Sequence, residues 1–252
     1  MSGVGAVVVA GAGGRLGAAI ARELAGRGAP LVLTDVRSES LMAVSSELDP
    51  ARVKAVVAAD CRDESAVAAL VRTAAQLQGG IAALVNASGI EGPVAPVEEL
   101  DLRAVVEVYE INVFAALVLL KAVVPYMRRQ GFGRIVNVAS GAGLSGSDDM
   151  AAYSSSKHAL VGITRSLARE LAPSGVSVNA ICPGCIESPM MERIESALAG
   201  VRGQGEVSFV GSIPAGRYAR PQEIAHVTAY LALEAPAYLT GTALLVDGGL
   251  YA

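Results

Sequence analysis

Short apolar runs alternate with longer amphipathic stretches along the chain. The apolar runs predict strands over residues 6–10, 31–34, 53–58, 82–85, 135–138, 176–181 and 243–246. Apolar residues recur at helical spacing between these runs, which predicts helices over residues 16–26, 64–77, 101–129, 151–171 and 221–233. Strands that alternate with helices are typical of an α/β fold with a parallel, doubly wound sheet and helices on both faces. We therefore expect a single domain over residues 1–252.

Glycines and polar residues follow the apolar runs directly, at the carboxyl ends of the predicted strands. They are the segment 11–17, Asp35, Asp60, the segment 86–89, Ser140 and the pair Pro183-Gly184. The carboxyl ends of parallel strands meet at one edge of a sheet, and ligands of open α/β sheets bind there. The pattern therefore predicts one functional site at this edge.

The segment Gly11-Ala12-Gly13-Gly14-Arg15-Leu16-Gly17 joins the first strand to the first helix. Glycine lets the backbone approach a ligand closely, and the N–H groups at the start of a helix favour an anion. This context predicts a site for the pyrophosphate of a dinucleotide. The match to the G-x-G-x-x-G motif is imperfect, because Leu16 stands where the third glycine belongs and Gly17 follows one position later.

Asp35 ends the second strand, where a carboxylate can accept hydrogen bonds from the ribose hydroxyls of adenosine. The same carboxylate repels a 2′-phosphate, by up to about 4 kcal/mol at contact distance and an effective dielectric constant of about 20. Asp35 therefore favours NAD as the cofactor. Arg15 and Arg37 can pair with that phosphate, so NADP remains open.

Tyr153 and Lys157 are four residues apart in the predicted helix 151–171, so they lie on one helix face. A nearby ammonium group favours the ionised phenol and lowers its pKa, which suits a group that transfers protons. Moving a phenol pKa from about 10 to about 7 takes roughly 4 kcal/mol. The Y-x-x-x-K spacing also arises by chance, and the upstream glycine turn and Ser140 make the catalytic interpretation preferable.

The composition argues against several other classes of protein. The chain is 52% hydrophobic and only 4% aromatic, as expected for a parallel sheet buried on both faces. A net charge of −4 without a basic stripe argues against a nucleic-acid partner. The most apolar run, residues 113–124, is shorter than a membrane span, and no basic residue precedes the first apolar run as it would in a signal peptide. We expect a cytoplasmic protein that spans no membrane.

Together these residues resemble the short-chain dehydrogenase/reductase family over essentially the whole chain. The resemblance is to the branch of this length, which includes 3-oxoacyl-[acyl-carrier-protein] reductase-like and secondary-alcohol dehydrogenase members. It implies a Rossmann-type fold and an NAD(P)-dependent oxidoreductase that transfers a hydride between nicotinamide and a carbonyl or secondary alcohol. By this resemblance Ser140 hydrogen-bonds to the reacting oxygen and Tyr153 transfers the proton. Lys157 lowers the pKa of Tyr153 and holds the ribose, and Asn112 orders a water that supplies protons to Lys157.

The resemblance also implies which residues surround the cofactor and the substrate. The expected cofactor contacts are Gly11, Gly14, Arg15, Leu16, Gly17, Asp35, Asp60, Cys61, Asn86, Ala87, Ser88, Tyr153, Lys157, Pro183, Gly184, Ile186 and Ser188. The expected substrate contacts are Ser88, Glu91, Ser140, Met150, Tyr153 and Met190. No metal is expected, because a closed zinc site needs four ligands and the sequence has no second cluster of Cys or His beside Cys182 and Cys185.

The sequence departs from the family pattern at several positions. The glycines at 11, 14 and 17 have the G-x-x-G-x-x-G spacing of a longer-chain branch, and Ala87-Ser88 replaces Asn-Ala. Ser188 stands where a threonine usually contacts the carboxamide of nicotinamide. Cys182 and Cys185 have the spacing of a redox dithiol. The resemblance instead makes them neighbours of the family's Pro-Gly motif at Pro183-Gly184.

Residues 185–216 lack a strong period and contain Met190, Met191 and Phe209, so we expect a mobile apolar segment that covers the substrate. An apolar cover favours a small, apolar ketone or alcohol. Asp148 and Asp149 can face either a cationic substrate or water.

Two other functions remain open. A non-catalytic NAD(P)-sensing protein would keep the glycine turn without the proton donor. An epimerase or dehydratase fits the G-x-x-G-x-x-G spacing, although such enzymes usually carry a further substrate domain. The resemblance also implies a homotetramer, and the predicted helices 101–129 and 151–171 carry more apolar residues than one buried face requires.

Overall fold

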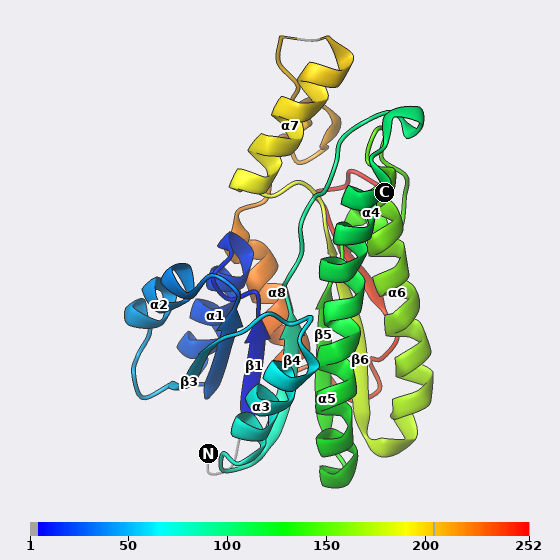
Figure 1. Cartoon of the computed structure of the whole chain (residues 1–252). Coiled ribbons are helices and arrows are strands. Elements are labelled where there is room, and N and C mark those ends of the chain that lie inside the picture. Colours follow the sequence, from blue (N-terminus) through cyan, green and yellow to red (C-terminus); the bar gives the residue numbers. More distant parts are fainter. Residues whose placement is uncertain (1–4, 204, 252) are drawn as a thin grey trace.

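The computed structural model describes residues 5–203 and 205–251, and these form a parallel sheet of seven strands in the order β3-β2-β1-β4-β5-β6-β7 (Figure 1). The strands are β1 (Ala6–Ala10), β2 (Leu31–Asp35), β3 (Val53–Ala58), β4 (Ile81–Asn86), β5 (Gly133–Val138), β6 (Val176–Pro183) and β7 (Ala243–Val246). Each strand overlaps an apolar run in the sequence. The predicted fold class, a parallel doubly wound α/β sheet, is therefore confirmed.

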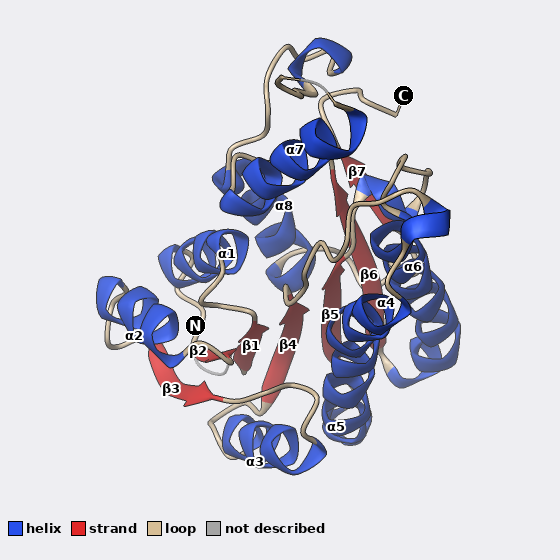
Figure 2. Ribbon diagram, turned by 45° about the horizontal axis from the view of Figure 1, so that its top comes forward, coloured by secondary structure: helices blue, strands red, loops and turns tan. Residues whose placement is uncertain are grey.

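Helices cover both faces of the sheet, which Figure 2 shows between two helical layers. One layer consists of α1 (Arg15–Gly26), α2 (Ser38–Glu47) and α8 (Pro221–Leu233). The other consists of α3 (Glu64–Ala75), α5 (Ala115–Gln130) and α6 (Ala151–Leu171).

The central strand β1 shows why the strands read as continuous apolar runs. Val7 and Val9 pack with α1 and α8, whereas Ala6, Val8 and Ala10 pack with α3 and α5. All five side chains are fully buried. A strand buried on both faces has no polar alternation, because neither face meets water.

The connections place one crevice at the carboxyl edge of this sheet. The chain runs outward from β1 to β2 and β3, and then returns to β4 on the other side of β1. The direction of winding reverses between β1 and β4, and such a switch point leaves a crevice beyond the carboxyl ends of the two strands. Helix α7 (Pro189–Arg202) lies beyond this edge of the sheet (Figure 1).

The predicted helix over residues 101–129 contains an irregularity that the sequence did not show. It consists of α4 (Leu102–Tyr109), a π-helical turn (Glu110–Phe114) and α5. By length and hydropathy alone the stretch Leu102–Gln130 could cross a membrane, and 44% of its most apolar window is buried in the protein. The inner side of α5 packs on the sheet through a buried stripe that includes Leu119, Val123 and Met127.

Two helices were absent from the sequence prediction. Helix α2 has a short apolar stripe, Leu41 and Val44, among several serines that weaken the helical pattern. Helix α7 lies in residues 185–216, a segment whose apolar residues show no strong helical period in the sequence. The signals for α7 were Ser188, whose side chain caps the helix start, and Pro189 at the first helical position.

Leu41 and Met42 are neighbours in α2 that test how much this helix depends on its buried stripe. Leu41 is 1% exposed within the core, whereas Met42 is 58% exposed. Leu41→Ala should lower the free energy of unfolding by about 2–5 kcal/mol through lost burial and a residual cavity, whereas Met42→Ala should change it by less than about 0.5 kcal/mol. Urea denaturation measures both. Equal losses would show that α2 is not anchored through Leu41.

Candidate active site

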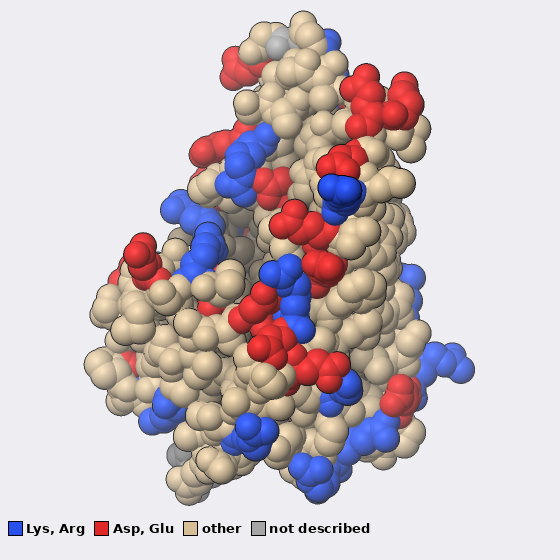
Figure 3. All heavy atoms as spheres, viewed as in Figure 1, with Lys and Arg blue, Asp and Glu red and all other residues tan. Residues whose placement is uncertain are grey.

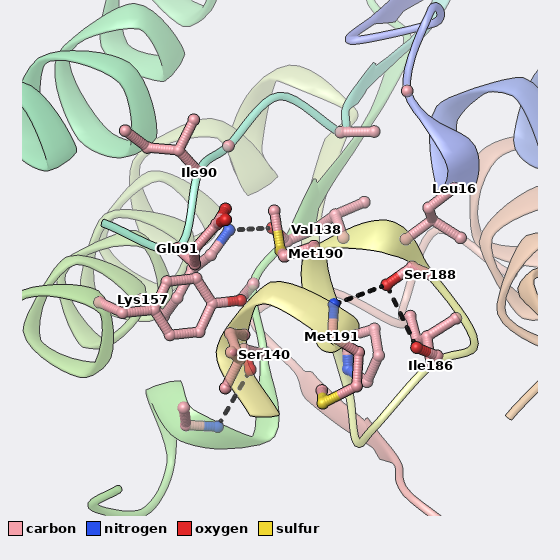
Figure 4. Close-up of a pocket in the computed structure, with 18 of the residues that line it drawn as sticks. Leu16, Ile90, Glu91, Val138, Ser140, Lys157, Ile186, Ser188, Met190 and Met191 are labelled. Atoms are coloured by element: carbon pink, nitrogen blue, oxygen red, sulfur yellow. Dashed lines mark hydrogen bonds between the residues drawn. The ribbon is translucent and has the colours of Figure 1, made fainter. Parts of the chain in front are cut away.

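The described residues form a cavity of ≈ 790 Å³ at the carboxyl edge of the sheet. The turns that follow β1, β2, β3, β4, β5 and β6 line it, and α7 forms its outer wall. Figure 4 shows Leu16, beside the glycine turn, across the cavity from Ser140, Lys157 and Glu91. This size and position are those of a cofactor and substrate site in an open α/β sheet.

The structure brings most of the predicted site residues to this cavity. Those that line it are Gly11, Gly14, Arg15, Leu16, Gly17, Asp35, Asp60, Cys61, Ala87, Ser88, Glu91, Ser140, Met150, Tyr153, Lys157, Pro183, Gly184, Ile186, Ser188 and Met190. Asn86 and Asn112 are the exceptions. Both are buried behind the cavity wall, at 2% and 1% exposure.

The glycine turn brings two backbone segments closer than any side chain would permit. A Cβ atom on Gly17 would lie 2.0 Å from the carbonyl oxygen of Gly11. Gly11 itself has φ +76°, and a Cβ there would meet the backbone of Ala87 and Ser88. Among the described residues no side chain caps the start of α1 and no acidic residue lies in its first turn. These N–H groups fit an anion such as a pyrophosphate.

Asp35 is held in place at the end of β2. Its carboxylate accepts hydrogen bonds from the backbone N–H groups of Gly13, at 3.0 Å, and Arg37, at 2.9 Å. The Nε of Arg37 lies 3.3 Å from the same carboxylate. The charge of Arg37 is therefore already engaged by Asp35, whereas Arg15 is exposed at the rim of the cavity.

Asp60 follows β3 and is bound by a neighbour that sequence reasoning missed. The guanidinium of Arg62 donates to both carboxylate oxygens, with Nη2 at 2.7 Å from Oδ2. These hydrogen bonds lower the pKa of Asp60 below its ordinary value. Arg62 also lines the cavity and pairs with Glu110 at 3.2 Å. No local pattern in the sequence distinguishes Arg62 from other surface arginines.

Ser140, Tyr153 and Lys157 lie together on one wall of the cavity. Ser140 follows β5, and its Oγ accepts a hydrogen bond from the backbone N–H of Ala142 at 3.2 Å, which leaves the hydroxyl proton available. The Ser140 hydroxyl is also a hydrogen-bond partner of the Tyr153 phenol. The Nζ of Lys157 lies 5.6 Å from the centre of the Tyr153 ring.

Burial dominates the electrostatics of this wall. It raises the pKa of Tyr153 above the ordinary value, and the hydrogen bond with Ser140 offsets only part of that increase. This direction is opposite to the one that the Tyr153–Lys157 spacing predicted. The ammonium of Lys157 lies over the ring and donates to the Val138 carbonyl at 3.1 Å (Figure 4). Burial also lowers the pKa of Lys157 to about 8.

Asn112 supports the site from behind. Its Oδ1 accepts from the N–H of Ile90 at 2.8 Å, and its Nδ2 donates to the Ile90 carbonyl at 2.9 Å. Nδ2 also donates to the Oγ of Ser156 at 3.0 Å, and Ser156 donates to the Tyr153 carbonyl at 2.7 Å. Both amide protons are therefore used within the protein, so this side chain has none left to donate to a water. Asn112 is a positioning residue for the Ile90 loop and for α6.

Asn86, a predicted cofactor contact, does not line the cavity. It ends β4 beside β1, where its side chain is enclosed, and its Oδ1 has no hydrogen-bond partner among the described residues. The residues that follow, Ala87 and Ser88, reach the cavity in its place. Asn86 therefore belongs to the sheet, whereas Ala87 and Ser88 belong to the site.

The outer wall of the cavity is an apolar cluster tied down by charged pairs. Met150, Ile194 and Leu198 are buried in it, and Tyr153, Met190 and Phe209 pack against them. Arg193 of α7 binds Glu91, on the loop after β4, and Arg202 at the end of α7 lies 3.4 Å from Asp149. Asp149 thus has a protein partner, whereas Asp148 is 92% exposed, with Arg202 at 3.8 Å. Acidic and basic side chains are interspersed on the face shown in Figure 3.

Ser188 and the cysteines have partners that limit their chemistry. The Ser188 hydroxyl donates to the Ile186 carbonyl and accepts from the Met191 N–H, both at 3.2 Å (Figure 4). It therefore caps α7 at the edge of the cavity. Burial raises the pKa of the Cys185 thiol to about 11 and also raises that of Cys182, so neither is a ready thiolate.

Tyr251 and Arg193 are cavity residues that sequence reasoning missed. Tyr251 lies near the end of the chain, and its ring packs where a Cβ on Gly141 would be, at 2.5 Å. Arg193 lies one turn into the unpredicted helix α7. Only the tertiary fold brings them to the site, and no local signal identifies either one.

Comparisons with known proteins agree with this fold and site. A family profile described as Enoyl-(Acyl carrier protein) reductase matches residues 11–251. Cis-4-hydroxycyclohexanecarboxylate dehydrogenase from Sinomonas cyclohexanicum is 39% identical over 243 residues, which cover 96% of this chain and 94% of that protein.

Solved structures show the same architecture. Levodione reductase has a TM-score of 0.92 and 34% identity, covering 99% of this chain and 98% of its own. An actinorhodin polyketide ketoreductase with NADPH has a TM-score of 0.90 and 35% identity, with coverages of 98% and 97%. NAD+-bound xylitol dehydrogenase has a TM-score of 0.90 and 36% identity, with coverages of 97% and 98%.

These relatives are dehydrogenases and reductases, and they give no support to the sensor or epimerase interpretations. The chain matches the family profile over almost its whole length. It therefore belongs to the short-chain dehydrogenase/reductase family and is an NAD(P)-dependent oxidoreductase that acts on carbonyl or secondary-alcohol groups of small molecules.

Proposed function

We propose that Tyr153 is the general acid and base of this oxidoreductase, with Ser140 as the hydrogen-bond donor to the reacting oxygen. The observation that carries the proposal is the position of Ser140, Tyr153 and Lys157 on one cavity wall, across from the glycine turn. The ordinary pKa of a phenol, about 10, already keeps Tyr153 protonated at neutral pH, and burial raises that pKa further. A protonated phenol is the form that donates to a developing alkoxide.

The bound cofactor supplies or accepts the hydride, and the protein positions and polarises the reacting groups. In the direction of reduction, the carbonyl carbon gains the hydride and negative charge develops on its oxygen. The Ser140 hydroxyl donates a hydrogen bond to that oxygen. The Tyr153 hydroxyl transfers its proton to it, which leaves a phenolate near the Lys157 ammonium. Oxidation of an alcohol reverses these steps, with Tyr153 as the base.

The proposed cofactor contacts follow the cavity from the glycine turn to Lys157. The start of α1 and the residues Gly11 to Gly17 hold the pyrophosphate, and Asp60 lies at the adenine end. Asp35 accepts hydrogen bonds from the ribose and disfavours a 2′-phosphate, so NAD is the preferred cofactor. The engagement of Arg37 by Asp35 supports this preference, and exposed Arg15 is the residue that would admit NADP.

The proposed substrate is a small ketone or secondary alcohol whose apolar part packs against Met150, Met190 and Ile194. Two relatives support this, since their names denote a ring with a hydroxyl and a carboxylate and a dione, whereas a third acts on a sugar alcohol, which is small but has no apolar part. We propose that residues 185–216 act as a cover for this substrate within a single domain of residues 1–252. Unpaired thiols at Cys61, Cys182 and Cys185 support a cytoplasmic location.

We also propose that the chain forms a homotetramer. Large apolar side chains are exposed along α4, the π-helical turn and the start of α5: Leu102, Val106, Phe114 and Leu117. A row of this kind is typical of a surface that another protein covers. α4 and α5 form one long helical stretch along the side of the molecule (Figure 1).

Replacing Gly17 tests the proposed pyrophosphate site. Gly17→Ala places a Cβ 2.0 Å from the Gly11 carbonyl oxygen, so the turn must open. The affinity for NADH, measured by titration of nicotinamide fluorescence, should fall by at least about tenfold. Gly26→Ala is the matched control in the same helix, because its Cβ meets no atom within 4 Å. Equal affinities of the two variants would place the pyrophosphate elsewhere.

Replacing Tyr153 tests the proposed chemistry. Tyr153→Phe should lower kcat by at least about 100-fold in a screen of ketones and alcohols with NAD(H) and NADP(H), because general acid–base catalysis is lost. NADH binding should persist, and Tyr126→Phe on α5 serves as the control. Turnover within a few-fold of the original protein would exclude Tyr153 as the proton donor.

The same screen measures the cofactor preference, and faster turnover with NADPH would refute the preference for NAD.

The oligomeric state tests the exposed row on α4 and α5. Light scattering at micromolar concentration should give the mass of four chains. Val106→Lys should reduce that mass, because it places a charge in the row, whereas Met42→Lys, equally exposed on α2, should not. A monomeric mass for the unmodified chain would refute the tetramer.

A further inference from the structure

The loop after β4 holds Glu91 rigidly at the cavity. Its predecessor Ile90 is fixed by two hydrogen bonds to the side chain of Asn112. Its successor Gly92 has φ +69° and lies so close to α4 that a Cβ would meet Val108 at 2.2 Å. Glu91 therefore sits between two pinned backbone positions, and its side chain is only 15% exposed.

Glu91 fixes Arg193 through one edge of the guanidinium. Nε of Arg193 donates to Oε1, and Nη2 donates to Oε2 at 3.2 Å. This arrangement occupies the Nε–Nη2 edge of the planar group. Among the described residues Nη1 has no hydrogen-bond partner, and Arg193 lines the cavity. One face of the cavity thus presents a positioned donor with unused N–H groups.

This donor lies near the reacting groups. Met190, one helical turn before Arg193, packs with Tyr153 in the apolar cluster. Glu91 is close enough for its charge to act on the Tyr153 phenol. Arg202, the other arginine of α7 in the cavity wall, is nine residues farther along, roughly 13 Å at the rise of an α-helix. Arg193 is therefore the α7 arginine that lies nearer to Tyr153 along the helix.

We propose that Arg193 binds a second oxygen acceptor on the substrate, a ketone or a carboxylate, and that Glu91 positions its guanidinium for this contact. The inference rests on the proposed binding of the reacting oxygen by Ser140 and Tyr153. It narrows the substrate class to dioxo compounds and oxo acids, or the corresponding hydroxy compounds. A ketone without a second oxygen leaves the Arg193 donor without a substrate partner and binds more weakly.

A matched series of ring ketones tests this proposal: cyclohexanone, 1,4-cyclohexanedione and 4-oxocyclohexanecarboxylate. Reduction of each is followed with NADH and with NADPH. The unmodified protein should reduce at least one of the two difunctional ketones with a kcat/KM at least about tenfold above that for cyclohexanone, mainly through a lower KM. A preference for the oxo acid alone identifies the carboxylate as the bound group, and a preference for both identifies any oxygen acceptor.

Variants assign the preference to Arg193. Arg193→Gln should bring the ratio of kcat/KM values close to one, and Arg193→Lys, which keeps the charge, should retain part of it. Glu91→Gln should raise KM for the difunctional ketones more than it changes kcat. Arg202→Gln, the control on the same helix, should keep the ratio of the unmodified protein.

Two results would overturn the inference while the proposed function stands. One is reduction of all three ketones by the unmodified protein with similar kcat/KM. The other is an equal loss for all three ketones in Arg193→Gln, which would mean that the arginine only supports the cavity wall. Failure to turn over any ketone or alcohol with either cofactor would instead refute the proposed function, and this inference with it.

Discussion

Burial of the central strands on both faces is the constraint on which the site depends. β1 and β4 are covered by helices above and below, so a polar side chain within them would lose its contact with water. Polar groups that must meet a ligand can therefore lie only where the strands end. The order of the strands then decides which ends are adjacent. Because the winding reverses between β1 and β4, the glycine turn and the loop after β4 face the same crevice.

Local patterns were sufficient to predict the parts of this arrangement that are themselves local. The seven apolar runs became the seven strands of the described sheet, and the stripe over residues 151–171 became α6 with the same bounds. Residues at strand ends reached the cavity because the parallel topology collects such ends at one edge. Asn86, the last residue of β4, does not line the cavity, because it is enclosed between the neighbouring strands β1 and β5.

The remaining parts depend on contacts between distant segments, which no single window of sequence contains. Arg193 and Glu91 are 102 positions apart, and only the placement of α7 over the cavity brings them together. The sign of the pKa shift of Tyr153 is a similar case. The four-residue spacing correctly placed the lysine on the same helix face, but it carried no information about burial or about the Val138 carbonyl that binds the ammonium.

The π-helical turn Glu110–Phe114 has a geometric consequence for the whole long helix. An α-helix rotates by about 100° with each residue, and a π-helical turn is equivalent to one residue inserted into an α-helix. Deleting one residue here would restore regular winding but would turn α4 and α5 against each other by that angle. Either Leu119 and Met127 would then no longer pack on the sheet, or Asn112 would lose its hydrogen bonds to Ile90. The extra residue thus shifts the rotational phase of the long helix. Asn112 can therefore face Ile90 while Leu119 and Met127 face the sheet.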